Sequence, residues 1–145
     1  MLGLCVRPEP KLLPNLINGD HLPPQQILVV DDDDDIRAGV VDYLQEHGYL
    51  AVGAINGRDA LDQLKSPDLR PCIMVIDLMM PVMDGGTFRE EQLRTPYLSA
   101  IPVIVISANV DLETRAASLE AVSYLPKPLD LAALLDVVRS RCVSG

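Results

Sequence analysis

Short apolar runs alternate with segments of helical periodicity along most of the chain. Five runs predict strands: Ile27–Val30, Leu50–Ala54, Cys72–Ile76, Pro102–Ile106 and the brief Tyr124-Leu125. The segments that follow them predict helices at Ile36–His47, Gly57–Lys65, within Gly86–Arg94, at Leu112–Leu119 and at Leu129–Arg141. Strands that alternate with helices predict an α/β fold, a doubly wound parallel sheet with right-handed crossovers and helices on both faces.

Residues 1–25 do not share this pattern. Five prolines fall within them, and Asn15, Asn18 and Gly19 interrupt any periodicity. We therefore interpret 1–25 as a Pro-rich N-terminal tail or linker, and 26–143 as one domain, which agrees with a length of 145 residues.

Composition narrows the class of protein. With 48% hydrophobic and 3% aromatic residues, the chain can form a substantial, mainly aliphatic core. A net charge of −9 argues against direct binding of nucleic acid, which selects basic surfaces. No apolar stretch reaches the length of a membrane span, and the N-terminus lacks a signal-peptide pattern.

The cysteines lack ligand spacing. Cys5, Cys72 and Cys142 are an odd number without a CxxC pair, so we expect reduced thiols in a cytoplasmic protein rather than a disulfide framework. Cys72 borders an apolar run, which favours a small core residue.

Charged and polar residues follow the predicted strands directly. Asp31 and Asp32 follow the first strand, Asp77 the third, Ser107 the fourth, and Lys127 comes shortly after the fifth. Because ligands of open α/β sheets bind at the carboxyl ends of the strands, we expect these side chains to converge at one edge.

This set of side chains supports phosphoryl chemistry. Carboxylates crowded at a strand end repel each other, and a hard cation such as Mg²⁺ relieves that cost. Asp31, Asp32 and Asp77 would bind the cation, and Asp77 could then form an aspartyl-phosphate. The Lys127 ammonium and the Ser107 hydroxyl would contact the phosphoryl oxygens.

Each residue alone has a simpler interpretation. An aspartate after a strand is commonly a turn residue or a helix N-cap, a serine is commonly a cap, and a lysine between prolines can be an exposed loop residue. Asp33–Asp35 suit the first turn of the following helix. His47 suits a helix end rather than phosphotransfer, and the stripe Leu131, Leu134, Leu135 and Val138 suits the core.

Four motifs, in order, resemble the receiver domain of two-component response regulators. They are ILVVDDDDDIR (Ile27–Arg37), VIDLMMPVMDG (Val75–Gly85), PVIVISA (Pro102–Ala108) and YLPKP (Tyr124–Pro128), and the resemblance runs from about Gln26 to Val143. It implies a flavodoxin-like fold with a five-stranded parallel sheet of order 2-1-3-4-5.

The resemblance also implies roles for single residues. Asp77 would be the phosphoacceptor; Asp31, Asp32 and the backbone carbonyl of Met79 would complete the Mg²⁺ site. Ser107 and Tyr124 would be the switch residues and Lys127 the site lysine. The Lys127–Pro128 bond corresponds to one that is often cis in the family.

One segment departs from the family pattern. The helix before the last strand usually ends at a glycine in an Ala-Gly-Ala-like stretch, whereas this chain has Leu119-Glu120-Ala121-Val122 and is about two residues shorter. The resemblance therefore does not predict the geometry of this turn or of a signalling surface that uses it.

The implied function is a switch rather than an enzyme. A sensor histidine kinase or phosphotransfer protein would phosphorylate Asp77, and the altered surface would bind a downstream protein target; a homodimer is possible. No output domain follows the last predicted helix, which leaves two alternatives, a single-domain regulator and a piece of a longer protein.

Two rival functions stay open. One is a phosphatase or hydrolase with an aspartyl nucleophile, although such enzymes have a second acid where this chain has Met79. The other is a receiver-like interaction or dimerisation module that is not phosphorylated.

Overall fold

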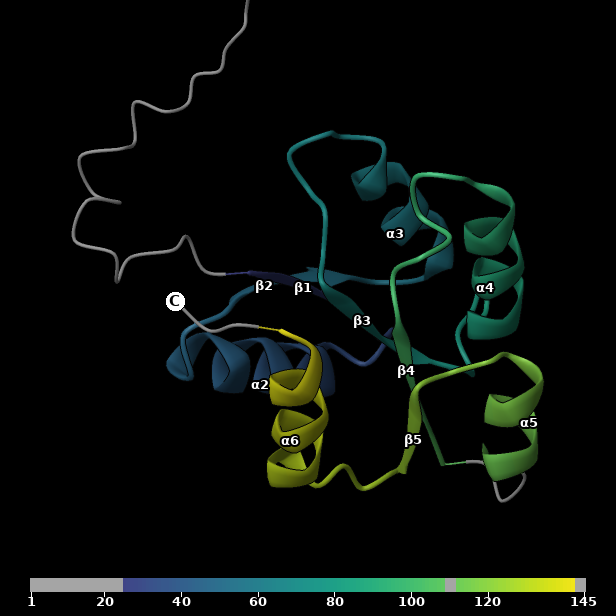
Figure 1. Ribbon diagram of the computed structural model, residues 1–145. Coiled ribbons are helices and arrows are strands. Elements are labelled where there is room, and N and C mark those ends of the chain that lie inside the picture. Colours follow the sequence, from purple (N-terminus) through teal and green to yellow (C-terminus); the bar gives the residue numbers. More distant parts are fainter. Residues whose placement is uncertain (1–24, 109–111, 143–145) are drawn as a thin grey trace, which may run out of the picture.

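A single parallel sheet of five strands organises the chain. The computed structural model describes residues 25–108 and 112–142. The strands are β1 (Gln26–Val30), β2 (Leu50–Ala54), β3 (Ile73–Asp77), β4 (Val103–Ser107) and β5 (Ser123–Pro126). Their order is β2-β1-β3-β4-β5, which confirms the predicted flavodoxin-like topology (Figure 1).

Helices follow each strand. They are α2 (Asp34–Glu46), α3 (Gly57–Leu64), α4 (Gly85–Arg94), α5 (Leu112–Ser118) and α6 (Leu131–Arg141). Asp33, Asn56, Asp84 and Asp130 accept hydrogen bonds from the first-turn amides of α2, α3, α4 and α6. These caps satisfy amides that have no partner within a helix, so each helix begins at the residue after its cap.

Two aliphatic cores lie on opposite faces of the sheet. On one face α3, α4 and α5 pack over inward side chains such as Leu28, Val30 and Ile76. On the other face α2 and α6 pack over side chains such as Val29, Val75 and Ile104. Successive strand residues point to opposite faces, so strands covered on both sides are apolar at nearly every position.

The predicted helical stripe on α6 belongs to this second core. Leu134, Leu135 and Val138 are buried, and Leu131 is partly buried against them. At the end of α2, His47 is the C-cap residue, and its Nδ1 lies 2.8 Å from the Tyr43 carbonyl oxygen. Both observations agree with the structural interpretation of these residues.

The strand register places four strand ends at one edge of the sheet. Val30 lies opposite Ile76, Asp77 opposite Ile106, and Ser107 opposite Pro126. Residues that follow β1, β3, β4 and β5 in the sequence are therefore neighbours in space.

The prediction about cysteines is wrong for one pair. Cys72 and Cys142 form a disulfide, with an S–S distance of 2.09 Å and a Cα–Cα distance of 5.9 Å. Cys72 precedes β3 and is only partly buried, and Cys142 follows α6. The disulfide could not be predicted from the sequence, because the two cysteines are 70 residues apart and only the packing of α6 on the sheet brings them together.

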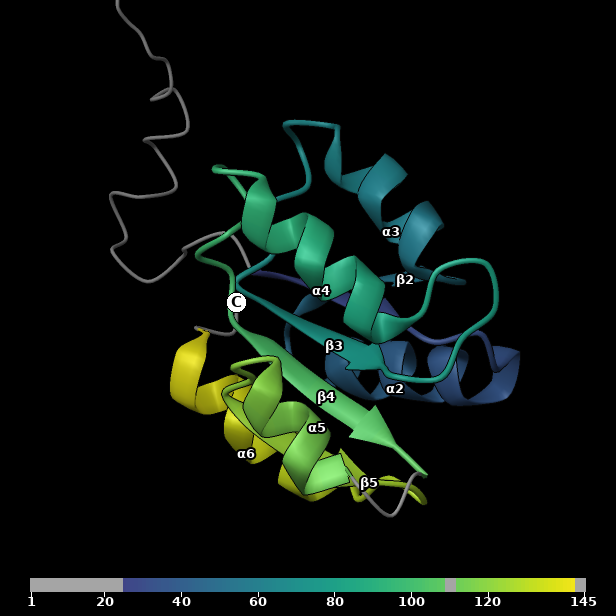
Figure 2. The same cartoon turned by 90° about the vertical axis from the view of Figure 1, so that its right-hand side faces the viewer.

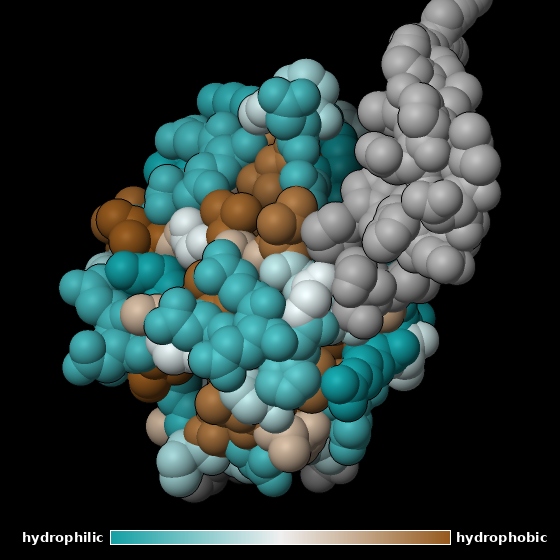
Figure 3. All heavy atoms as spheres, turned by 90° about the vertical axis from the view of Figure 1, so that its left-hand side faces the viewer, coloured by the Kyte–Doolittle hydropathy of each residue, from teal (hydrophilic) through white to brown (hydrophobic). Residues whose placement is uncertain are grey.

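The remaining surface is mixed in polarity. On the β2 side, hydrophobic residues are exposed in several separate places among hydrophilic ones (Figure 3). None of the described helices has the length and apolar character needed to cross a membrane. The predicted tail at 1–25 falls, except for Gln25, outside the described residues, as does Cys5.

Candidate functional site

Asp31 and Asp32 lie between the end of β1 and the N-terminus of α2. The Asp31 backbone amide donates to the Ala54 carbonyl at 3.1 Å, which extends the pairing of β1 with β2 by one residue. The Asp31 side chain is fully buried, and its Oδ1 accepts from the Asp33 amide at 2.9 Å. Asp32 is exposed. The backbone turn thus presents one buried and one exposed carboxylate beyond the strand.

Arg37 supports this turn, and sequence reasoning did not assign it a role. Its Nη1 donates to the Asp31 carbonyl at 2.8 Å, and its Nη2 pairs with Asp34 at 2.6 Å. A Cβ on Gly53 would lie 3.0 Å from the Arg37 Cδ, so the arginine stem passes directly over that glycine. The available signal was a basic residue in the first turn of an otherwise acidic helix start.

Asp77 ends β3 and is almost fully buried. Its Oδ1 accepts from the Met79 amide at 3.1 Å, and its Oδ2 accepts from Lys127 Nζ at 3.0 Å. The backbone also approaches closely here, because a Cβ on Gly85 would lie only 2.6 Å from the Asp77 carbonyl oxygen. The start of α4 is therefore packed against the backbone that carries Asp77.

Lys127 joins both strand-end acids. Its amide donates to the Ser107 carbonyl at 3.0 Å, which places it beside the end of β4. Its Nζ lies 3.0 Å from Asp77 Oδ2 and 3.1 Å from Asp31 Oδ2. The Lys127–Pro128 peptide bond is cis, as the resemblance implied.

The pKa values in this cluster reflect burial and charge. Burial raises the pKa of the Asp77 carboxyl above its ordinary value, and hydrogen bonds from Lys127 and the Met79 amide offset only part of that effect. Burial alone would lower the pKa of the Lys127 ammonium, but its hydrogen bond to Asp77 and the negative charges of Asp77 and Asp31 together outweigh that effect, so that pKa is raised. Lys127 therefore remains charged at neutral pH.

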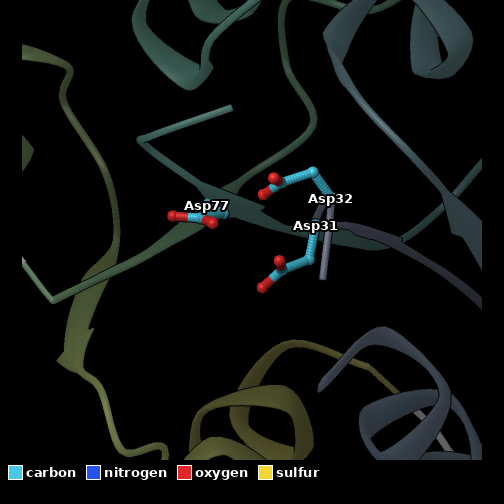
Figure 4. A group of neighbouring side chains, drawn as sticks. All are labelled: Asp31, Asp32 and Asp77. Carbon is cyan, nitrogen blue, oxygen red and sulfur yellow. The ribbon is translucent and has the colours of Figure 1, made fainter. Parts of the chain in front are cut away.

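The acidic residues form a set that could hold a divalent cation. One oxygen from each of Asp31, Asp32 and Asp77 lies within 4.8 Å of the others. Figure 4 shows the three side chains at the adjacent ends of β1 and β3. Asp31 Oδ2 is buried and accepts no hydrogen bond, despite its ion-pair distance to Lys127. A buried carboxylate oxygen with an unused lone pair suits a hard, oxygen-seeking ion such as Mg²⁺.

A hollow opens over this set of acids. Its lining consists of Asp32, Asp33, Asp77, Met79, Ala108 and Lys127. Met79 therefore borders the hollow, and the role of its carbonyl as a metal ligand stays a prediction.

The two expected switch residues lie at different depths. Ser107 is fully buried at the end of β4, directly before Ala108 of the hollow's lining. Tyr124 lies on β5 and is 41% exposed. Of the predicted site residues, the structure thus brings Asp32, Asp77, Met79 and Lys127 to one hollow. Asp31 is buried against Lys127, Ser107 directly precedes the lining, and Tyr124 lies on the next strand.

The chain is similar in sequence to known response regulators. The chain is 40% identical over 119 residues to the response regulator MprA of Mycolicibacterium vanbaalenii, and 37% identical over 117 residues to MprA of Mycobacterium tuberculosis. These matches cover 81% and 79% of this chain. The chain spans about half the length of these relatives, 50% and 49%.

Solved structures share the fold. A response regulator receiver protein from Pseudomonas putida superposes with a TM-score of 0.75 at 30% identity, covering 83% of this chain and 99% of that one. The chemotaxis response regulator CheY4 of Vibrio cholerae gives 0.73 at 27% identity, covering 81% and 98%. The response regulator receiver domain model matches residues 27–139. The chain therefore belongs to the response regulator receiver domain family of two-component signalling.

Proposed function

We propose that this receiver accepts a phosphoryl group on Asp77 in a Mg²⁺-dependent reaction and thereby switches a protein-interaction surface. The observation that carries the proposal is the position of Lys127 Nζ, 3.0 Å from Asp77 and 3.1 Å from Asp31. A nucleophilic carboxylate, a fixed cation and the Asp32 carboxylate then border one hollow, and the buried Asp31 carboxylate lies beside the cation. That combination suits charge development on a transferred phosphoryl group.

In the proposed reaction, a carboxylate oxygen of Asp77 attacks phosphorus of a phosphohistidine on a sensor kinase or phosphotransfer protein. The new O–P bond forms as the P–N bond breaks, and the leaving imidazole nitrogen keeps the bonding electron pair and takes up a proton from solvent water. Lys127 neutralises charge on the phosphoryl oxygens. A bound Mg²⁺, held by Asp31, Asp32, Asp77 and the Met79 carbonyl, would supply further positive charge there.

The switching step is assigned to Ser107 and Tyr124. The Ser107 hydroxyl would turn toward a phosphoryl oxygen, since its residue directly precedes the lining of the hollow. Tyr124, partly exposed on the neighbouring strand, would then move inward and change the surface formed by α5, β5 and α6. This surface would contact a downstream protein target or a second copy of the chain.

We further propose that 26–143 forms the receiver and that 1–25 is a tail outside it, in a protein that works in the cytoplasm. The family match at 27–139 supports the domain boundary. Removal of residues 1–25 is expected to leave phosphorylation and thermal stability unchanged. A loss of either would assign the tail to the domain.

The experiment that tests the proposed reaction is intact-mass measurement after incubation with acetyl phosphate and Mg²⁺. One added phosphoryl group is expected, and EDTA or Asp77→Asn should abolish it. Asp31→Asn should raise the Mg²⁺ concentration needed by about 10- to 100-fold, the usual cost of disturbing a metal site. The matched control is Asp62→Asn, which alters an exposed carboxylate on α3.

Other outcomes point to the rival functions. A folded protein that gains no phosphoryl group with Mg²⁺ present would contradict the proposal and favour an interaction module that is not phosphorylated. Continuous turnover of a phosphomonoester would instead favour a phosphatase.

A further inference from the structure

Helix α4 carries two buried polar side chains that the phosphoryl chemistry does not use. Arg89 is 6% exposed and Gln92 is fully buried, on a helix face that packs toward the sheet. A guanidinium keeps its charge in proteins, so burying one costs free energy unless its N–H groups find acceptors. Burial lowers the pKa of Arg89, which is the expected sign of that cost.

Arg89 directs its donors at the turn between α5 and β5. Its Nε donates to the Leu119 carbonyl at 2.9 Å, and its Nη2 donates to the Glu120 carbonyl at 3.3 Å. Both carbonyls come just after α5, which ends at Ser118. Arg89 of a neighbouring helix thus supplies donors to two carbonyls just beyond the end of α5.

The turn that Arg89 contacts has an unfavourable backbone. Glu120 has a φ of 57°, a left-handed conformation that glycine adopts freely and that is unfavourable for other residues. This turn contains no glycine, since the stretch reads Leu119-Glu120-Ala121-Val122. Contacts from outside the turn offset that cost, and Arg89 provides two of them.

Gln92 orients the guanidinium and extends the network. Its Oε1 accepts from Arg89 Nη1 at 2.7 Å, while its Nε2 donates to the Leu98 and Ile101 carbonyls, each at 2.9 Å. Leu98 and Ile101 belong to the connection between α4 and β4. Two side chains of α4 therefore join the turn after α5 to the segment before β4, on the side of the sheet where α4 and α5 are neighbours (Figures 1 and 2).

We propose that Arg89, oriented by Gln92, is a positioning residue for the output surface of this receiver. It holds the α5–β5 turn in its left-handed conformation and so fixes the end of α5 relative to α4. Three residues beyond Glu120, β5 begins at Ser123 and carries Tyr124. The surface of α5 and β5 therefore depends on Arg89, although Arg89 does not border the Asp77 hollow. That this surface responds to phosphorylation rests on the proposed function.

Hydrogen–deuterium exchange with mass spectrometry on the whole chain tests the positioning role. Arg89→Met removes every donor and keeps much of the volume. It is expected to accelerate exchange at least 10-fold in peptides covering 115–126, and to leave peptides from β1 and β3 unchanged. The matched control is Arg94→Met, an exposed arginine on the same helix that pairs with Glu91. It should have no effect on 115–126.

A rescue experiment separates positioning from general destabilisation. If Arg89 holds a left-handed turn, Glu120→Gly should restore most of the protection that Arg89→Met removes. If Arg89→Met does not fold, Arg89→Lys provides the comparison, since it retains one donor and should loosen the same turn less. Unchanged exchange at 115–126, an equal rise in all peptides, or no rescue by Glu120→Gly would each overturn the proposal.

A second readout concerns the response to phosphorylation. Acetyl phosphate and Mg²⁺ should load Arg89→Met to within twofold of the wild-type level, but the accompanying change in exchange at 115–126 should be lost. A wild-type response in this variant would overturn the role in output. If the wild-type chain takes no phosphoryl group, the proposed function fails, while the exchange of the unphosphorylated variants still decides the role of Arg89.

Discussion

Lys127 Nζ donates a hydrogen bond to Asp77 Oδ2 at 3.0 Å, across 50 residues of chain. Because the same ammonium lies 3.1 Å from Asp31 Oδ2, it offsets the repulsion between two buried carboxylates. It also occupies the place where negative charge would gather on a phosphoryl group attached to Asp77.

Replacement of this ammonium should slow phosphorylation. For Lys127→Met, we expect the rate of Asp77 phosphorylation by acetyl phosphate to fall by about 10²- to 10³-fold, as when one charge-stabilising donor is removed from an active site. The time course of intact mass measures this rate. Lys65→Met, which removes an exposed ammonium at the C-terminal end of α3, should match the wild type. Wild-type kinetics in folded Lys127→Met would contradict the proposed role.

The raised pKa of Asp77 predicts a pH-dependent stability. The folded state binds the Asp77 proton more tightly than the unfolded state, so this residue reduces the free energy of unfolding as pH rises through the raised pKa. The Asp77→Asn variant has no carboxyl to ionise at this position, so it lacks this loss in the free energy of unfolding. Without metal, it should therefore be more stable than the wild type at neutral pH.

The difference should shrink as pH falls below the ordinary carboxyl range, where Asp77 is protonated in both states. Urea unfolding at a series of pH values measures it. A wild type more stable than Asp77→Asn at neutral pH, in EDTA, would show that the Lys127 contact outweighs burial.

Gly85 is predicted to be required for the geometry of the site. In Gly85→Ala the new Cβ would meet the Asp77 carbonyl oxygen at 2.6 Å, so the backbone must shift. We expect a loss of about 1–3 kcal/mol in the free energy of unfolding, the usual cost of overpacking, together with slower phosphorylation. Gly39→Ala is the matched control.

Gly39 lies inside α2 with nothing within 4 Å of a Cβ. Alanine there should add about 0.5–1 kcal/mol of stability, because it restricts the unfolded chain and favours helix. Urea denaturation measures the free energy of unfolding of both variants. If Gly85→Ala were as stable as Gly39→Ala, the backbone at the start of α4 would accommodate the new Cβ with no loss in the free energy of unfolding.

The Cys72–Cys142 disulfide should stabilise the domain through the unfolded state. Closing a loop of about 70 residues reduces the entropy of the unfolded chain by an amount worth on the order of 4 kcal/mol. A dithiol reductant should therefore lower the Tm of the wild type, while Cys142→Ser should show a low Tm with or without reductant.

Thiol alkylation of the native protein provides the control for this prediction. In the absence of reductant, only Cys5 should react. Alkylation of all three cysteines under non-reducing conditions would show that the disulfide does not form in solution.

Much of the fold could be predicted from the pattern of apolar residues. Val103–Ile106 is apolar at every position and lies in β4, which is covered on both faces. A short, continuous apolar run of this kind is typical of a buried central strand. The element boundaries moved by one or two residues where caps decided them. Asp33 and Asp130, for example, set the starts of α2 and α6 through hydrogen bonds that periodicity does not encode.

The candidate site was predictable for a related reason. Asp31 follows β1 directly, and Asp77 and Ser107 are the last residues of β3 and β4. Parallel strands that are neighbours end at a common edge. Arg89 and Gln92 were not predictable in this way. Two polar residues three positions apart on a helix resemble a solvent-exposed face, and only the carbonyls of Leu119, Leu98 and Ile101 explain their burial.

The sequence by itself determined the order of strands and helices, the aliphatic core and the polar residues at the strand ends, since these depend on local periodicity and on rules common to parallel sheets. The tertiary structure alone decided the Cys72–Cys142 pairing, the close approach of Gly85 to Asp77 and the burial of Arg89. Each of these depends on a distance between segments far apart in the chain, and such distances are set only when helices pack against the sheet.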